Sequence, residues 1–209
     1  MHRLESILRR ILEGRRLPPF PKYGPQCVWP VSEKEFSIAD TALGETPLVD
    51  KEEATAVFSN PTGQIYNVML IDDASNIADP NNGQRPSVCD FVITTDNQTI
   101  LVLGELKNSS ENNLYSGLRR NGTLRVGQHG KAVEQLKSTL QMISEDYGAG
   151  DKRRCVVSFR IRPIPGAVVN RLKSSFSSIV VNHKITRLPD DTFPGWKFFS
   201  HPYPEPFPL

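Results

Sequence analysis

The chain has 209 residues, a mass of 23.4 kDa, 38% hydrophobic residues and 23% charged residues, which is the composition of an ordinary globular domain. A chain of this length buries about 70% of its unfolded surface, so its stability requires neither a structural metal nor a disulfide framework. No run approaches the roughly 18 apolar residues of a membrane span, and the first residues lack the apolar core of a signal peptide. We therefore expect an intracellular protein with no membrane partner. The three widely spaced cysteines are typical of reduced packing thiols: Cys27, Cys89 and Cys155.

The net charge of +2 is distributed unevenly along the chain. Between Glu33 and Glu111 lie 14 acidic and 4 basic residues, a net charge of −10, so the remaining residues carry +12. Two stretches, 112–133 and 152–189, contain basic residues and no acid. This layout is compatible with a site that holds a cation and binds a polyanion around it, and also with solvated surface charge.

In chain order, the first expected element is an amphipathic helix over 2–14, where apolar residues recur at helical spacing. A proline-rich connector over 17–30 excludes regular helix and a central strand there. Short helices are predicted over Glu33–Leu43 and Asp50–Phe58. Three strands follow, and a tight turn at Asp96-Asn97 is expected to join the last two as a hairpin. These strands are Gln64–Ile71, Val88–Thr95 and Thr99–Lys107.

The remaining pattern predicts a long helix over Lys131–Asp146, strands over Cys155–Arg160 and Ile179–Ile185, and a short helix over Gly166–Phe176. The tail over 193–209, rich in proline and aromatic residues, is expected to lie extended over the core. We expect a single α/β domain, a mixed sheet flanked by helices, with its core over about 50–187.

The predicted hairpin gathers the residues best suited to chemistry. Glu105 and Lys107 are two apart on one strand and therefore leave the same face of the sheet. With a two-residue turn, Asp90 opposes Leu103, which places Asp90 and Glu105 as diagonal neighbours at about 7–8 Å. A turn one residue longer would reverse this placement.

Two carboxylates at such a separation can share a divalent ion. Oxygen ligands from Asp90, Glu105 and the Leu106 carbonyl suit Mg²⁺ or Mn²⁺. Lys107 is placed to orient a water or to stabilise charge on a phosphate. The set is therefore sufficient for metal-assisted phosphodiester hydrolysis. The competing interpretation is an ordinary Glu–Lys ion pair on a strand.

Arg85-Pro86-Ser87-Val88-Cys89-Asp90, followed after fourteen residues by Gly104-Glu105-Leu106-Lys107, resembles the PD-(D/E)xK nuclease superfamily. The superfamily has a restriction-endonuclease-like core of helix, three-stranded meander, helix and strand, which matches the predicted order over about Gln64 to Phe159. The resemblance implies Asp90 and Glu105 as metal ligands and Lys107 as the catalytic lysine. The proline lies four positions before Asp90, which departs from the usual pattern.

The resemblance also suggests accessory residues. Related nucleases often add an upstream acid, for which Glu5, Glu52 and Glu53 are candidates, and RecB-type members carry a helix glutamine, for which Gln135 is the candidate. Basic and polar residues near the predicted long helix are candidate contacts to nucleic acid. They are Arg119, Arg120, Arg125, His129 and Lys131.

Two functions remain open from the sequence. The first is a Mg²⁺- or Mn²⁺-dependent DNA endonuclease acting on double-stranded DNA, for which a homodimer would allow both strands to be cut. The alternative is a catalytically weak or inactive module of the same fold that binds nucleic acid or a protein partner. The presence of Asp90, Glu105 and Lys107 together favours the first.

Overall fold

The fold is taken from a computed structural model, which describes residues 28–41, 45–71, 88–95, 100–109, 114, 117–118, 124–143, 152–161 and 184–209. For 117–118, 124–125 and 142–143 it describes the backbone alone. Several predicted features lie outside the described residues. They are the helix over 2–14, most of the connector over 17–30, Glu5, Cys27, Arg119, Arg120, the helix over 166–176 and most of the strand over 179–185.

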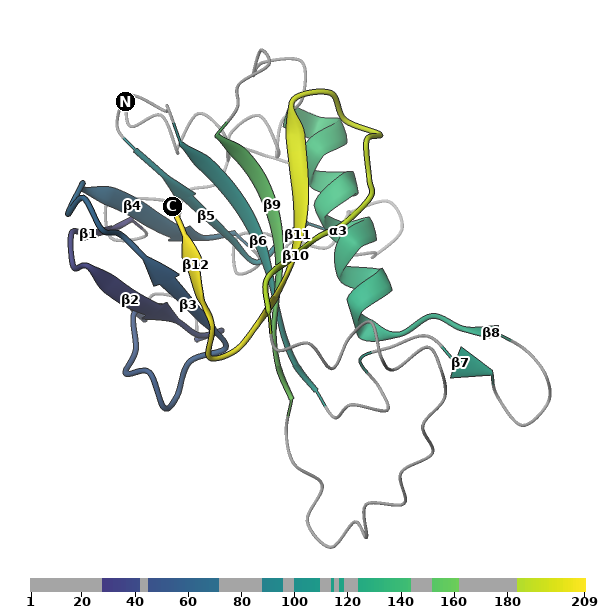
Figure 1. Cartoon of the computed structure of the whole chain (residues 1–209), viewed down its shortest axis with the longest axis horizontal. Coiled ribbons are helices and arrows are strands. Elements are labelled where there is room, and N and C mark those ends of the chain that lie inside the picture. Colours follow the sequence, from purple (N-terminus) through teal and green to yellow (C-terminus); the bar gives the residue numbers. More distant parts are fainter. Residues whose placement is uncertain are drawn as a thin grey trace, which may run out of the picture.

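A seven-stranded mixed sheet forms the centre of the fold (Figure 1). Its strand order is β1-β4-β5-β6-β9-β11-β10. Neighbours from β1 to β6 are antiparallel, β6, β9 and β11 are parallel, and β10 is antiparallel to β11. The strands are β1 (Trp29–Val31), β4 (Tyr66–Leu70), β5 (Phe91–Thr94), β6 (Leu101–Ser109), β9 (Arg153–Ile161), β10 (Thr186–Arg187) and β11 (Trp196–Pro202).

The other elements are a smaller sheet, a two-stranded ribbon and one long helix in the described part of the chain. The smaller sheet has the order β12-β3-β2, and the ribbon pairs β7 with β8. The bounds are β2 (Glu35–Ile38), β3 (Ala56–Ser59), β12 (Pro206–Pro208), β7 (Gly117–Leu118), β8 (Leu124–Arg125) and α3 (Gln128–Ile143). Among the described residues, no helix has the length and apolar character needed to span a membrane.

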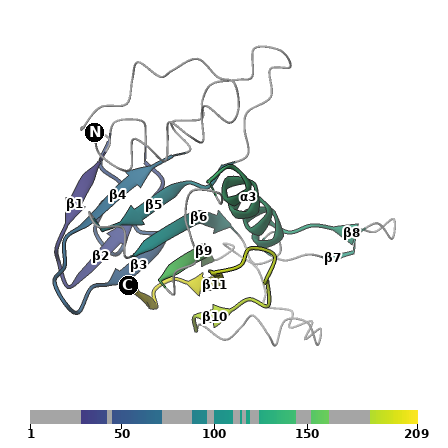
Figure 2. The ribbon, with the colours of Figure 1, turned by 90° about the horizontal axis from the view of Figure 1, so that it is seen from above.

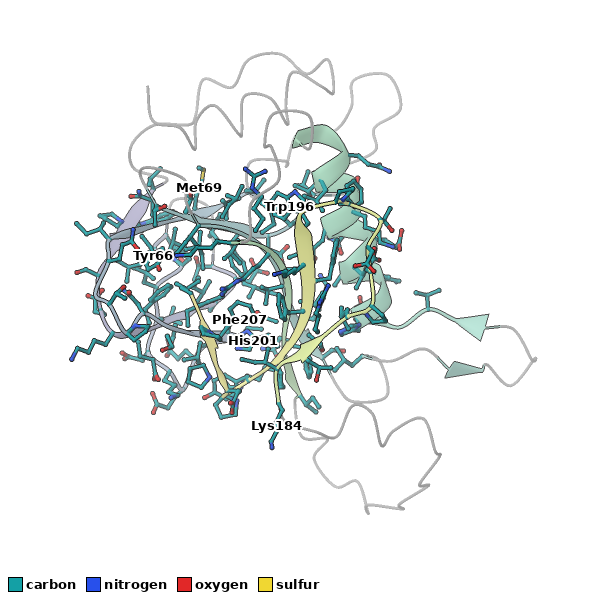
Figure 3. All side chains as sticks on the ribbon, turned by 45° about the horizontal axis from the view of Figure 1, so that its top comes forward. Tyr66, Met69, Lys184, Trp196, His201 and Phe207 are labelled. Carbon is teal, nitrogen blue, oxygen red and sulfur yellow. The ribbon has the colours of Figure 1, made fainter. Side chains whose placement is uncertain are left out.

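The elements stack in three layers, with α3 on one face of the large sheet and the small sheet on the other (Figures 1 and 2). One apolar core lies beneath α3 and includes Leu136, Leu140, Leu103 and Val157. The second core lies between the sheets, where the labelled His201 and Phe207 lie beside each other in Figure 3. The large sheet is thus covered on both faces, which accounts for its runs of buried apolar residues.

The central part of the sequence prediction is confirmed. The antiparallel meander β4-β5-β6, the helix α3 and the parallel strand β9 occur in the predicted order. The mixed α/β architecture with a mixed sheet is also confirmed. Of the expected flanking helices, the described residues show α3 on one face of the sheet, and the small sheet covers the opposite face.

Two predicted short helices are wrong. Glu33–Leu43 contains β2 instead, and within Asp50–Phe58 a turn at 51–53 leads into β3. Phe36 and Phe58 stack face to face across these strands at 5.5 Å between ring centroids. This apolar packing against the large sheet overrides the local helix preference of a segment rich in Ala, Glu and Asp.

The tail contributes strands to both sheets. Residues 196–202 form β11, parallel to β9, and residues 206–208 form β12, parallel to β3. The tail is thus extended, as expected, but it is built into the two sheets through backbone pairing. At the other end of the described chain, β1 contains Pro30 and lies at the sheet edge, where a missing N–H is tolerated.

Candidate functional site

The candidate site lies where β5 begins and β6 continues beyond it. Phe91 pairs with Gly104, and the residues of β6 after Gly104 pair only with β9 among the described strands. The backbone N–H of Asp90 also donates to the Gly104 carbonyl at 3.0 Å, so Asp90 and Phe91 both oppose Gly104 as in a β-bulge. Asp90 therefore stands at the point where the two strands separate.

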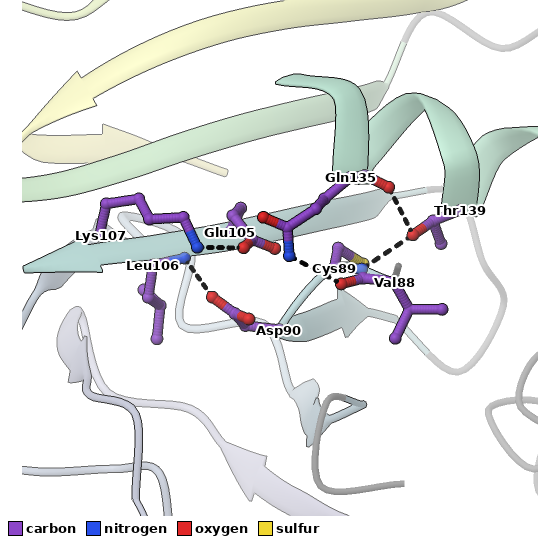
Figure 4. A network of polar contacts seen from close by, with 8 residues as sticks. All are labelled: Val88, Cys89, Asp90, Glu105, Leu106, Lys107, Gln135 and Thr139. Atoms are coloured by element: carbon purple, nitrogen blue, oxygen red, sulfur yellow. Dashed lines mark hydrogen bonds and ion pairs between the residues drawn. The ribbon is translucent and has the colours of Figure 1, made fainter. Parts of the chain in front are cut away.

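The Asp90 carboxylate takes the position of a missing strand neighbour. Its Oδ2 accepts a hydrogen bond of 2.6 Å from the Leu106 N–H, the first such group of β6 beyond β5 (Figure 4). The N–H and C=O of one residue point to the same side of a strand, so the Leu106 carbonyl also faces this edge. Asp90 is 7% exposed, which means that its charge lies largely out of water.

Glu105 and Lys107 project from the α3 face of β6, since they alternate with residues packed between the sheets. The Lys107 ammonium forms an ion pair with Glu105 Oε1. Glu105 is fully buried, whereas the Lys107 side chain is 19% exposed and reaches toward the surface. The structure thus brings Asp90, Glu105, Leu106 and Lys107 to one end of the β5–β6 hairpin, as the sequence predicted.

Helix α3 is attached to the segment that precedes Asp90. Gln135 Nε2 donates to the Val88 carbonyl at 3.4 Å, and the Cys89 N–H donates to Thr139 Oγ1 at 2.8 Å. Gln135 therefore lies beside the site, with its side-chain amide directed to the backbone two residues before Asp90 (Figure 4). Sequence reasoning missed Thr139. Its only sequence signal is a hydroxyl residue four positions after Gln135, within the apolar face of the helix.

The cysteines near the site have a packing role. Cys89 and Cys155 are free and fully buried, as expected. Burial, and secondly the nearby Glu105 carboxylate, raise the pKa of the Cys89 thiol well above its ordinary value. Burial also raises the pKa of Cys155. Both thiols are therefore protonated at neutral pH, and neither is suited to be a nucleophile.

His129 lies in the first turn of α3 and contacts β9, the strand next to the β6 strand that carries Lys107. Its Nε2 is 3.0 Å from the Ser200 hydroxyl, and its ring meets the edge of Phe159 at 6.1 Å between centroids. Phe159 is the register partner of Lys107 on β9. Burial lowers the pKa of His129, so the imidazole is neutral at pH 7. Lys131, two residues further along α3, is exposed.

The basic residues have more than one role. Arg125 lies in β8, and the β7–β8 ribbon projects away from the sheets beside the start of α3 (Figures 1 and 2). Arg154 donates to the Pro208 carbonyl and lies 5.6 Å from the Phe207 ring centroid. Arg160 donates to the carbonyls of Glu52 and Ala54 and stacks on Tyr203. Part of the acid-free stretch 152–189 therefore serves the fold.

Two of the three candidate upstream acids, Glu52 and Glu53, are not on a helix, and the third, Glu5, lies outside the described residues. Glu52 and Glu53 are exposed residues of the turn at 51–53, before β3 of the small sheet. That sheet covers the face of the large sheet opposite α3, whereas Glu105 and Lys107 project toward α3. The expectation of a helix carrying a further acid in 50–58 is therefore wrong.

The acidic centre consists of two carboxylates. In the described parts of the chain, no group of three or more His, Cys, Asp or Glu side chains is close enough together to hold a metal ion. Any cation held here would thus rely on Asp90, Glu105, backbone oxygen and water. Comparison of the chain with protein-family models, with curated proteins and with solved structures finds no match.

Proposed function

We propose that this protein is a Mg²⁺- or Mn²⁺-dependent nuclease that hydrolyses phosphodiester bonds in DNA. The observation that carries the proposal is the hydrogen bond from the Leu106 N–H to the Asp90 carboxylate. It brings Asp90 to the part of β6 beyond its last pair with β5, beside Glu105 and Lys107, at the end of the hairpin. The composition of this site agrees with the PD-(D/E)xK motif to which the sequence is similar.

The residues at this site fit a divalent cation. Asp90 and Glu105 carry two negative charges, and the Lys107 ammonium compensates one of them. Mg²⁺ and Mn²⁺ bind through one or two carboxylates and retain several waters, so the two acids with the Leu106 carbonyl are a sufficient donor set. When bound, such a cation supplies a Lewis acid for the phosphate and lowers the pKa of a coordinated water.

The protein side chains supply position and charge. Glu105 is fully buried, so its attraction to a cation is weakly screened. The backbone of Lys107 is held in β6 and its side chain is partly exposed, so its ammonium can leave Glu105 and contact a phosphate oxygen. In that position it orients the attacking water and stabilises charge that develops on the phosphate.

Contacts to the nucleic acid are assigned to the surface around this end of the sheet. Gln135 borders the site from α3, and His129 and Lys131 occupy the first turns of the same helix. Arg125 in the projecting ribbon, together with Arg119 and Arg120, supplies cationic contacts to phosphates. The proposed substrate is double-stranded DNA, and a homodimer of the protein would place two such sites on opposite strands.

Cleavage assays with matched variants test the proposal. Supercoiled plasmid, linear duplex, single-stranded DNA and RNA are incubated with Mg²⁺, Mn²⁺ or EDTA. Asp90→Asn and Glu105→Gln remove one charge each with little change of shape, and both are expected to abolish metal-dependent cleavage. Glu35→Gln is the control, because Glu35 pairs with Lys51 in an exposed ion pair on the small sheet.

The substrate panel also separates the two candidate functions. Cleavage of DNA by the wild type and by Glu35→Gln, but not by Asp90→Asn, supports the nuclease. Absence of cleavage on every substrate, with equal nucleic-acid binding by wild type and Asp90→Asn, favours the inactive binding module instead.

A further inference from the structure

A buried hydroxyl on α3 holds the chain immediately before Asp90. Thr139 is fully buried, and its Oγ1 accepts the Cys89 N–H at 2.8 Å while donating to the Gln135 carbonyl at 3.0 Å. Gln135 and Thr139 are four residues apart and therefore share one face of the helix. Gln135 adds a hydrogen bond to Val88, so two consecutive residues ahead of Asp90 are bound to α3 (Figure 4).

The hydrogen bonds to α3 hold a segment that the β5–β6 pairing does not reach. Val88 and Cys89 precede β5 and its ladder, whereas Asp90 still bonds to Gly104 and Ile71. The Cys89 N–H consequently has its hydrogen-bond acceptor on the helix. A buried N–H without an acceptor costs about 1–3 kcal/mol, so the Thr139 hydroxyl strongly constrains this peptide.

The backbone of Asp90 is then fixed from three directions. Thr139 holds the preceding peptide, the Asp90 N–H donates to Gly104 on β6, and the Asp90 carbonyl accepts the Ile71 N–H at 2.7 Å. The position of this backbone sets where the carboxylate can reach. Oδ2 is 2.6 Å from the Leu106 nitrogen, and this short contact leaves little freedom for the backbone to shift.

We infer that Thr139 is a positioning residue of the cation site, which acts through the Cys89–Asp90 peptide on the Asp90 carboxylate. The inference rests on the proposed function. Ligand groups must be held within about 0.5 Å of their productive position, and loss of an outer-shell partner commonly lowers metal affinity 10- to 100-fold. Removal of the Thr139 hydroxyl therefore weakens cation binding in molecules that are still folded.

The decisive variant is Thr139→Val, which keeps the shape of the side chain and removes the hydroxyl. Thr139→Ser restores the hydroxyl without the methyl group. Thr94→Val is the matched control, since Thr94 is another buried threonine, whose Oγ1 donates to the Ile100 carbonyl at 2.9 Å at the opposite end of β5. If the role of Thr139 were purely structural, Thr139→Val and Thr94→Val would both lower the stability of the protein and leave its cation affinity unchanged.

The measurement is Mn²⁺ binding to the full chain by electron paramagnetic resonance, without nucleic acid, at a temperature where each variant is folded. Thr139→Val is expected to raise the Mn²⁺ Kd about 10-fold or more, whereas Thr139→Ser and Thr94→Val stay close to wild type. If Thr139→Val does not fold, Gln135→Met, which removes the bond to Val88, is measured in its place and is expected to raise the Kd to a smaller extent.

The outcomes separate the inference from the proposed function. Wild-type Mn²⁺ affinity in folded Thr139→Val, with binding lost in Asp90→Asn, overturns the role of Thr139 and leaves the cation site standing. Where Gln135→Met replaces it, wild-type affinity overturns the inference in its general form, that the attachment of residues 88–89 to α3 positions Asp90. Equal Mn²⁺ binding by wild type and Asp90→Asn, or none by the wild type, overturns the cation site and the inference together.

Discussion

The ring of Phe91 lies directly over Gly104, across the β5–β6 pair. A Cβ atom at Gly104 would be 1.8 Å from Phe91 Cζ, so no side chain fits beneath the ring. Phe91 and Gly104 are register partners. Phe91 directly follows Asp90, and Gly104 directly precedes Glu105. This contact therefore fixes the relative position of the strands beside the two candidate metal ligands.

Gly104→Ala is expected to destabilise the protein by about 3 kcal/mol, the upper part of the range for an overpacked core. The Phe91 ring must move, and it is buried between the two sheets among residues that also leave no space. Urea unfolding monitored by circular dichroism measures the loss. A double-mutant cycle with Phe91→Leu checks the cause, because the cost of Gly104→Ala should fall by about 1 kcal/mol or more in that background. Equal cost in both backgrounds would assign the effect to another contact.

Lys107→Met is expected to strengthen Mn²⁺ binding while abolishing cleavage. The Lys107 ammonium compensates the buried Glu105, and a cation at the same carboxylate must compete with it. Loss of one partner of a buried pair destabilises the metal-free protein by about 3 kcal/mol. The increase in Tm caused by Mn²⁺ should therefore be larger in Lys107→Met than in the wild type.

Lys51→Met provides the comparison for this prediction, since Lys51 pairs with Glu35 at 2.8 Å on an exposed surface. It should change neither the Mn²⁺-dependent shift in Tm nor cleavage. An identical Mn²⁺-dependent shift in Lys107→Met and in the wild type would show that Lys107 does not compete for the cation.

The candidate site was predictable from the sequence because an error of two residues in the strand register leaves each side chain on the same face of the sheet. The expected two-residue turn was wrong, since the Thr95 N–H bonds to the Ile100 carbonyl, which leaves four residues between the paired ends of the strands. This shifts the register by two residues and leaves the parity unchanged, so Glu105 and Lys107 keep their face. The bulge at Asp90 was not predictable, because it depends on the Asp90 N–H and carboxylate binding two residues of β6.

The prolines of the C-terminal segment prevented the prediction of its strands from the sequence. Pro206 and Pro208 alternate around Phe207 on β12, an edge strand of the small sheet. Alternate residues of an edge strand direct their N–H groups away from the neighbouring strand, so prolines there break no ladder bond. The Pro208 carbonyl points outward in the same way and accepts a hydrogen bond from Arg154. Composition alone favours an extended tail, and only tertiary pairing identifies it as strand.

Two groups of arginines are expected to respond differently to substitution. Arg119→Ala with Arg120→Ala should weaken DNA binding and reduce the slope of log K against log salt by about 2, one unit for each lost phosphate contact. Arg154→Met should lower stability and leave that slope unchanged, because Arg154 is bound to Pro208 and Phe207. Salt-dependent binding of a fluorescent duplex measures both variants. A slope unaltered by the double substitution would remove Arg119 and Arg120 from the interface.

The stability of the fold should decrease with acid because of His201. Its Nε2 donates to the Glu205 carbonyl, so Nδ1 accepts from the Ser158 hydroxyl at 2.9 Å and the ring is neutral. Burial lowers the pKa of His201 to about 4, compared with an ordinary value of 6.5.

Between these two pH values the unfolded chain binds a proton that the folded chain does not. The contribution of His201 to the free energy of unfolding is therefore fully retained above pH 6.5, falls by about 3 kcal/mol in total as the pH drops toward 4, and levels off below that. Burial lowers the pKa of His129 in the same direction, so the His201 contribution is obtained as the difference between wild type and His201→Gln. Urea unfolding at pH 7.5, 5.5 and 4 should show a weaker pH dependence in the variant, and parallel curves for the two proteins would contradict this assignment.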